Sequence, residues 1–354
     1  MFIVIAGLLA VVVLVATGWW RLAFAVFGIR PAKMTVEHNG LLVSAPADVE
    51  RVDAILRSFA GGFNAMISHP SSTGWRRYCD SLPPLCQPFA HEGAAMGFTL
   101  RRLFRYDAAA FEEGIVRVRS GFRYLYYVGL GFWSGMRNHD PQRLAGIVDG
   151  LDPLYRYLCY DGYGFKQAFF DGTRSPQGLG RLEALEGYAL NAAYQGVGRA
   201  LFFLFMDRPE RMVEYIDQLG AYAGDAAAGL GLAAVFVNPD RIEVARNLGG
   251  QLPAAWHDQF HLGVCFGLKA RFINNTDQFE RDLAHLEPSV RQAARAAIRE
   301  CDRIELQVRS EPGAEGYNKW RRLVRRWMAE HVEFPLAGLK AAAAPVIAQR
   351  TASA

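Results

Sequence analysis

Small-residue pairs built around glycine recur along the chain at nearly constant spacing, and this repeat constrains the fold more than any other feature of the sequence. The first glycines of six units are Gly93, Gly129, Gly162, Gly196, Gly229 and Gly263. Successive members are 36, 33, 34, 33 and 34 residues apart. Each lies in an apolar, aromatic stretch, and in most units a turn signal and a second amphipathic segment follow it. A period of 33–34 residues with two helices per unit is typical of stacked α-hairpins.

We therefore predict an all-α fold in which α-hairpin repeats of about 33–34 residues form an α-solenoid or a closed α/α array over residues 85–312. Each glycine inside a helix costs about 0.8–1 kcal/mol relative to alanine. The missing side chain allows a neighbouring helix to approach closely, and that contact offsets the cost. A phosphate-binding glycine loop is disfavoured because such a loop occurs once, between a strand and a helix.

The N-terminus predicts a membrane anchor over residues 1–21. The stretch from Phe2 to Gly18 carries no charge, and Trp19 and Trp20 follow it. About 20 apolar residues span the hydrocarbon core, and tryptophan favours the interface. A cleavable signal peptide is the rival interpretation, but a basic n-region is missing. Basic residues follow the stretch and none precede it, so we expect a single-pass protein of the cytoplasmic membrane, with the bulk of the chain on the cytoplasmic face.

Three further segments flank the repeats. Residues 22–84 contain Ser-, Pro- and Gly-rich stretches and predict an entry region with a partial helix at 48–66. Residues 313–339 predict a basic amphipathic helix, which either lies on anionic lipid headgroups or covers one end of the array. Residues 340–354 predict a flexible tail.

Composition excludes several classes of protein. The 39 Lys and Arg against 35 Asp and Glu give a net charge of only +4, which disfavours a nucleic-acid partner. Five cysteines without a CxxC pair argue against a disulfide framework or a cysteine-rich zinc module. No P-loop, nucleophile elbow or Asp-rich magnesium motif is present, and we predict no cofactor.

Several blocks resemble the domain-of-unknown-function family 1702. They are HEGAAMGF at 91–98, YYVGLGFWSG at 126–135, DGYGF at 161–165, QGVGRALFF at 195–203 and GLGLAAVF at 229–236. The resemblance covers about residues 75–335. It implies a role in bacterial secondary-metabolite biosynthesis, in enediyne and other gene clusters, beside a UnbV-type (CRTAC-like) partner protein. Enediyne-cluster members are expected to carry His after DGYGF, and this chain has Lys166 there, which suggests a different substrate branch.

The residue before each first glycine occupies an equivalent place in every unit, and two of these residues are acids. Glu92 and Asp161 are the exceptions among mostly apolar or neutral residues. Burial among aromatic rings raises the pKa of a carboxyl group and keeps it protonated as a general acid. Arg199 is a second charge in an apolar helix and needs an anionic partner. Either the acids pair with Arg199 to hold repeats together, or they contact a substrate.

We take Asp161 and Glu92 as candidate catalytic residues. The candidate substrate-binding residues surround them in the same motifs: Tyr127, Tyr160, Tyr163, Phe165, Lys166, Phe169 and Arg199. His257 and His261 are spaced i, i+4 in WHDQFH and share a helix face, which makes them weak metal candidates because no third ligand is evident.

With 23 Phe, 14 Tyr and 7 Trp, the array suits a hydrophobic small-molecule substrate. The first hypothesis is a cyclase- or isomerase-like enzyme that binds a polyketide polyene or a polyprenyl chain and starts its reaction by protonation. The second is a non-catalytic scaffold for partner enzymes, and the third is a carrier of a lipophilic intermediate. An enclosed aromatic pocket fits the first and third, whereas an open polar groove fits the second.

Overall fold

The computed structural model describes residues 24–69, 72–101, 107–137, 140–171, 176–311 and 316–340. These residues are almost entirely helical, and among them the only β-type pairing is an isolated bridge between Val332 and Leu339. The predicted all-α class is confirmed. The predicted anchor at 1–21 and nearly all of the predicted tail lie outside the described residues.

Seven helices form the centre of the molecule, and each packs against the next in the chain. They are α3 (Pro46–Ser68), α5 (Gln87–Arg101), α7 (Arg123–Met136), α9 (Tyr157–Lys166), α10 (Tyr188–Leu204), α12 (Ala223–Val237) and α14 (His257–Asn274). Short helices lie between them: α4 (Ser72–Ser81), α6 (Ala108–Phe111), α8 (Pro141–Val148), α11 (Pro209–Asp217) and α13 (Ile242–Gly249). A further short helix, α15 (Thr276–Ala284), follows α14. A π-helical turn, η4 (Gln167–Asp171), continues α9.

The recurring glycines lie at the closest contacts between the central helices. A Cβ atom added to Gly196 would overlap the carbonyl oxygen of Asp161, and one added to Gly162 would overlap that of Val128. Gly229 faces the carbonyl of Gln195 in the same way. Each of these carbonyls belongs to the residue just before the first glycine of the preceding unit, so the helices meet in one constant register. The expectation that these glycines lie at close helix contacts is confirmed.

Side chains near the end of this series of helices form hydrogen bonds with residues near its start. Arg51 of α3 donates two hydrogen bonds of 2.9 Å to Asp240, which follows α12. Arg271 of α14 donates to the carbonyl of Leu85 at 3.2 Å, directly before α5. The side chain of Asn274 donates to the carbonyl of Gly121 at 2.7 Å, at the start of α7.

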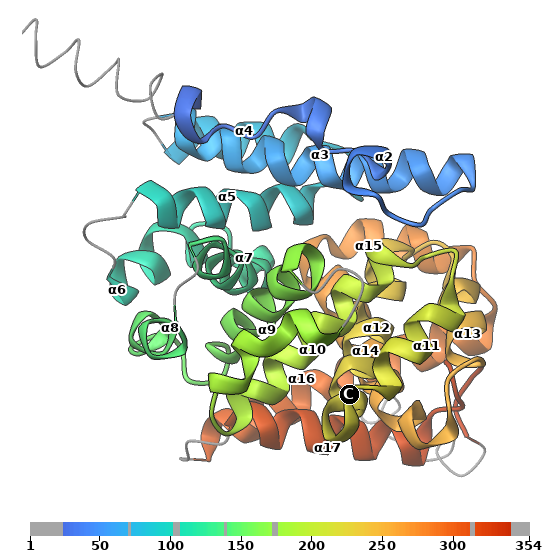
Figure 1. Ribbon diagram of the computed structural model, residues 1–354. Coiled ribbons are helices and arrows are strands. Elements are labelled where there is room, and N and C mark those ends of the chain that lie inside the picture. The colour runs from blue at the N-terminus through green and yellow to red at the C-terminus, as the bar shows by residue number, and fades with distance from the viewer. Residues whose placement is uncertain are drawn as a thin grey trace, which may run out of the picture.

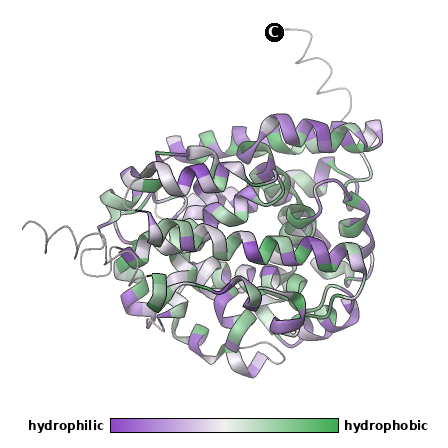
Figure 2. Ribbon diagram, turned by 90° about the horizontal axis from the view of Figure 1, so that it is seen from above, coloured by the Kyte–Doolittle hydropathy of each residue, from purple (hydrophilic) through white to green (hydrophobic). Residues whose placement is uncertain are grey.

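Two C-terminal helices cover one side of the array. They are α16 (Pro288–Ser310) and α17 (Gly316–His331), and both pack on α14. Figure 1 shows α17 on the side of the molecule opposite α2 (Val36–Asn39), α3 and α4. Hydrophilic and hydrophobic residues alternate along the outer helices, as expected for helices that bury one face (Figure 2).

The packing of α17 distinguishes between the two interpretations of the basic segment at 313–339. Trp320, Val324 and Met328 are buried, and the indole of Trp320 donates to the carbonyl of Cys301 at 3.2 Å. Because its apolar face is buried in the core, α17 is a covering helix and presents basic side chains such as Arg322 and Arg326 to solvent.

The segment predicted as an entry region, 22–84, contributes a full member of the array. Helix α3 extends over 23 residues, beyond the partial helix expected at 48–66, and packs along α5. Gly62 is the residue in the sequence that indicates this helix contact, because it faces the carbonyl of Ala90 as the later glycines face carbonyls of their neighbouring helices. In the described part of the chain, one helical stretch is long and apolar enough to cross a membrane, Gly220–Val237, and it is 67% buried as a core helix.

Candidate functional site

A buried cluster of one arginine and two carboxylic acids lies at the centre of the array. The Gly196 contact brings α10 against α9, and Arg199, about one helical turn later, faces Asp161. Its guanidinium donates to one carboxylate oxygen of Asp161 and lies 3.7 Å from Oε1 of Glu92 on α5. Asp161, Glu92 and Arg199 are only 1%, 4% and 6% exposed. Both acids therefore lie beside Arg199, as expected, but they do not share one cavity, because Asp161 and Glu92 line two different cavities.

Asp161 makes the closer contact with the Arg199 guanidinium. Its second oxygen accepts a hydrogen bond of 2.6 Å from Nε2 of Gln195, so both oxygens are bonded to donors. Burial would lower the pKa of Arg199, but the charges of Asp161 and Glu92 outweigh it and raise that pKa. Arg199 therefore stays a cation, and Asp161 is its counter-charge.

Glu92 has a different environment from Asp161. Burial raises the pKa of Glu92 to about 7, Arg199 partly counteracts this rise, and the negative charge of Asp161 adds to it. One arginine cannot neutralise two buried carboxylates, so the carboxyl group of Glu92, which has the weaker contact, ionises less readily than a free one. Glu92 is the group in this cluster that exchanges a proton near neutral pH.

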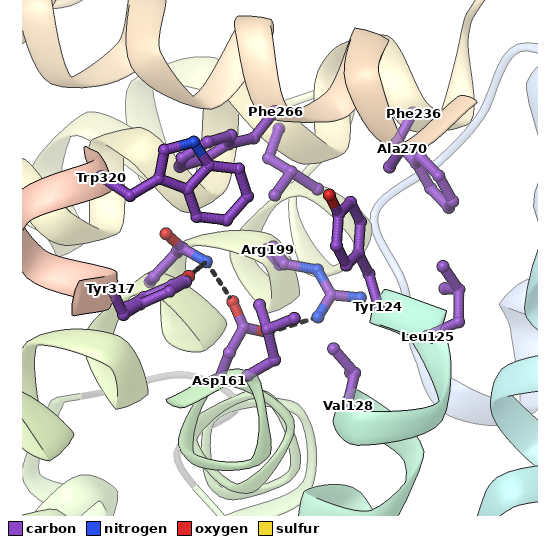
Figure 3. A pocket seen from close by; sticks show the side chains of 13 residues that line it. Tyr124, Leu125, Val128, Asp161, Arg199, Phe236, Phe266, Ala270, Tyr317 and Trp320 are labelled. Atoms are coloured by element: carbon purple, nitrogen blue, oxygen red, sulfur yellow. Dashed lines mark hydrogen bonds and ion pairs between the residues drawn. The ribbon is translucent and has the colours of Figure 1, made fainter. Parts of the chain in front are cut away.

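Arg199 separates two cavities. The smaller has a volume of about 50 Å³ and lies beside Asp161 and Gln195. Figure 3 shows Asp161 pointing from α9 toward Arg199, with Tyr317 and Trp320 of α17 on one side and Tyr124 of α7 on the other. The Oε1 atom of Gln195 is buried and has no hydrogen-bond partner among the described residues.

The larger cavity has a volume of about 290 Å³ and lies on the Glu92 side of Arg199. Its wall is mainly apolar and comes from α2, α3, α5, α7, α9, η4, α10 and the segment before α2. The aromatic members of this wall are Phe59, Phe89, Phe132, Phe165, Phe169, Phe170 and Phe203. Glu92 and Arg199 are the charged groups at its inner end, and Lys33 lies on its wall in the segment before α2.

Two of the aromatic residues expected to bind substrate, Phe165 and Phe169, line the larger cavity. Arg199 lines both cavities. Phe165 also lies under the Arg199 guanidinium, with 5.3 Å between Cζ and the ring centroid. These contacts agree with the geometry expected from the sequence.

The other four expected contacts, Tyr127, Tyr160, Tyr163 and Lys166, line neither of these cavities. Tyr160 packs against Tyr157, and Lys166 donates to Asp171 at 2.7 Å. Tyr160 and Tyr163 lie one residue before and two residues after Asp161 on α9, so they point about 100° and 200° away from it. On α7, Tyr127 donates its hydroxyl hydrogen to Glu112.

The two histidines of WHDQFH do not assemble a metal site with other ligands. No group of three or more His, Cys, Asp and Glu side chains in the described ranges is arranged to hold a metal ion. His257 is stacked on Phe334 and contacts the carbonyl of Leu252 at 2.9 Å. Burial lowers the pKa of His261 to about 3, so it is a neutral core residue.

Sequence reasoning missed Gln195 and the aromatic residues of α17 as parts of the site. Gln195 had a detectable signal, because it occupies the same position before a first glycine as Glu92 and Asp161. Tyr317 and Trp320 had no local signal, since they lie more than 110 residues from Arg199 in the sequence and come near it only through the packing of α17.

The fold and site define an all-helical protein that holds a buried arginine–carboxylate cluster between two apolar cavities. The chain belongs to the family described as Protein of unknown function (DUF1702), which matches residues 19–328. The resemblance found in the sequence motifs is thereby confirmed at the level of the family. No curated protein matches the chain. No solved structure matches it either.

Proposed function

We propose that the protein binds an elongated apolar polyene in the larger cavity and promotes its cyclisation or isomerisation by proton transfer from Glu92. The observation that carries this proposal is a buried carboxyl group with a pKa of about 7 on the wall of a largely aromatic cavity. A general acid works best when its pKa lies near the working pH. Glu92 meets that condition, and it faces the space that a substrate would occupy.

The cavity wall supports carbocation chemistry. Its volume of about 290 Å³ lies just below the roughly 300–1,000 Å³ typical of ligand pockets. Phenylalanine rings attract positive charge to their faces, so Phe132, Phe165 and Phe169 would stabilise a cation formed between them. The mainly apolar wall favours a hydrocarbon chain over a sugar or a nucleotide.

Glu92 both donates the proton that starts the reaction and accepts the proton that is released at its end. The carboxyl group donates its proton to a carbon of one C=C bond, and the neighbouring carbon becomes cationic. A second double bond attacks this carbon in a cyclisation, whereas no new C–C bond forms in an isomerisation. A C–H bond next to the final cation then breaks, and its proton returns to the Glu92 carboxylate. Arg199 lies beside Glu92, and burial, partly offset by Arg199, raises the pKa of Glu92 to near neutrality.

The wider setting is part of the same proposal. The central helices are interpreted as α-hairpin repeats, since their glycines meet in one register. The uncharged N-terminal stretch anchors the protein, with the array on the cytoplasmic face. The role in secondary-metabolite biosynthesis, the enediyne connection and the UnbV-type partner rest on the family resemblance.

A carrier of a lipophilic intermediate is the second candidate, because the same apolar cavity would serve it without any proton transfer. A scaffold role has less support, since the cavities are not an open polar groove.

The test compares full-length wild type with Glu92→Gln. Parinaric acid, a fluorescent conjugated polyene, reports binding to the cavity. Lipid extracts of a host that expresses the protein with its cluster partner, grown in D₂O, report conversion. We expect both proteins to bind parinaric acid within a factor of three, and only the wild type to form a new product carrying deuterium at the protonated carbon.

Glu113→Gln is the matched control, because the Glu113 side chain is 68% exposed and pairs with Arg117 at the surface. It should leave binding and product unchanged. Binding by both proteins with no conversion by either would support the carrier, and absence of binding would overturn both candidates.

A further inference from the structure

Exposed hydrophobic side chains lie at the larger cavity or close in sequence to one of its lining residues. Among the described residues, seven large hydrophobic side chains are strongly exposed. Met136 and Phe170 are 43% and 46% exposed and also line the cavity. Phe24, Val26 and Phe27 are 46%, 63% and 42% exposed and directly precede Ile29, another lining residue. Five of the seven therefore lie at this cavity or within five residues of its wall.

The segment that carries Phe24, Val26 and Phe27 is held in place over α3. Asn64 of α3 accepts a hydrogen bond from the Ile29 N–H at 2.9 Å and donates one to the Ile29 carbonyl at 2.8 Å. The Ile29 side chain also packs against the core cluster of Phe63, Met96 and Phe132. The exposed rings thus belong to a fixed segment of the rim.

Basic side chains accompany these hydrophobic ones. Arg30 and Lys33 are exposed in the same segment, and Arg137 is exposed next to Met136. Exposed aromatic and aliphatic side chains with arginine and lysine beside them are the pattern of a surface that lies at a bilayer interface. We define this rim by Phe24, Val26, Phe27, Arg30, Lys33, Met136, Arg137 and Phe170.

The chain itself connects this rim to an apolar segment. The uncharged stretch Phe2–Gly18 ends six residues before Phe24. Six residues span at most about 21 Å, so a membrane-inserted stretch would hold the rim close to the headgroups. Figure 1 shows the start of the described chain lying along α3, on the side of the molecule opposite α17.

We propose that the rim of the larger cavity lies against the lipid bilayer, so that the cavity opens to the membrane and takes its ligand directly from the lipid. The inference extends the proposed function, because it concerns the cavity proposed to hold the polyene. The membrane contact is nevertheless testable without any substrate. It also predicts the orientation of the protein, with α17 facing away from the bilayer.

The test introduces one surface cysteine at a time into the full-length protein and labels it with a fluorophore. All five native cysteines are free and buried, so a surface cysteine reacts selectively with a fluorophore. Met136→Cys and Phe170→Cys report on the rim. Leu306→Cys is the matched control, because Leu306 is 70% exposed on α16, which packs with α17. Each variant is labelled with NBD and reconstituted in phosphatidylcholine–phosphatidylglycerol vesicles with nitroxide-labelled lipid.

We expect the nitroxide lipid to quench NBD at positions 136 and 170 at least twofold more than at position 306. Two independent rim positions guard against one variant misfolding, and the melting temperature of each identifies a misfolded sample. Equal quenching at all three positions, or stronger quenching at position 306, would overturn the proposal. The polyene assay on Glu92→Gln is a separate readout, so failure of the membrane contact is distinguishable from failure of the proposed function.

Discussion

At the residue scale, two acids beside one arginine have different roles because their contacts differ. Asp161 accepts hydrogen bonds on both oxygens, from Arg199 and from Gln195. Glu92 stands 3.7 Å from the guanidinium and faces the larger cavity. The sequence offered both as acids or as structural partners. The contacts make Asp161 the closer partner of Arg199, and we propose Glu92 as the acid.

Asp161→Asn should destabilise the protein, because it leaves the buried Arg199 without its main counter-charge. Removing one partner of a buried ion pair typically costs about 3–5 kcal/mol. Urea denaturation should show this loss, while asparagine keeps the shape and an acceptor for Gln195. An unchanged unfolding free energy together with lost product would instead make Asp161 the catalytic acid.

Glu92 should make the stability of the protein depend on pH. Its pKa rises from 4.5 in the unfolded chain to about 7 when it is folded, so the folded state binds the extra proton between these values. Stability then falls as pH rises from about 4.5 to 7, by about 3 kcal/mol at 1.36 kcal/mol per pKa unit.

Glu92→Gln should remove this dependence, since glutamine does not ionise. The measurement is the unfolding free energy of both proteins at pH 5 and pH 8, with the variant gaining on the wild type at pH 8. Parallel pH profiles for the two proteins would show that Glu92 ionises without penalty in the fold.

At the scale of elements, glycine is required wherever a carbonyl of the next helix occupies the place of a side chain. Gly196 faces the Asp161 carbonyl, and Gly131 and Gly164 face carbonyls in the same way. In contrast, a Cβ at Gly146 on α8 would meet nothing within 4 Å. The glycines of this chain are therefore of two kinds: those where a side chain would overlap a neighbouring helix, and those where a side chain would have space.

Gly196→Leu should destabilise the protein by more than the ~1–3 kcal/mol usual for overpacking, because α9 and α10 must separate. Gly196→Ala is the milder version, and it should also destabilise. Gly146→Ala is its matched control and should be neutral or stabilising by up to about 1 kcal/mol, from helix propensity. Thermal unfolding of the three variants decides the matter, and equal effects of the two alanine substitutions would contradict the close-contact argument.

At the scale of the whole molecule, membrane attachment should depend on residues 2–20. Without them, the protein should be released into the soluble fraction by a high-salt wash, while the full-length chain stays in the membrane pellet. The rim side chains alone give only weak, reversible binding, since even one myristoyl chain anchors a protein marginally. A truncated protein that still pellets in high salt would place the attachment elsewhere.

The periodicity of glycine and apolar residues determined the all-helical class and the register of the central helices, because both depend on local spacing along the chain. The position before each first glycine also predicted that Glu92 and Asp161 are buried, because equivalent positions in a regular series of helices face the interior. The four expected contacts that line neither of the two cavities, such as Tyr160 and Lys166, are neighbours in sequence that point to other faces of their helices.

Only the tertiary structure decided that the pKa of Glu92 is raised, where the cavities lie and what covers them. A pKa depends on burial and on charges that come from distant parts of the chain, and Asp161 and Arg199 are 38 residues apart. The walls combine residues from the segment before α2 with residues of α10, and residues of α7 with residues of α17. Desolvation and ion pairing act through space, so local sequence spacing cannot determine them.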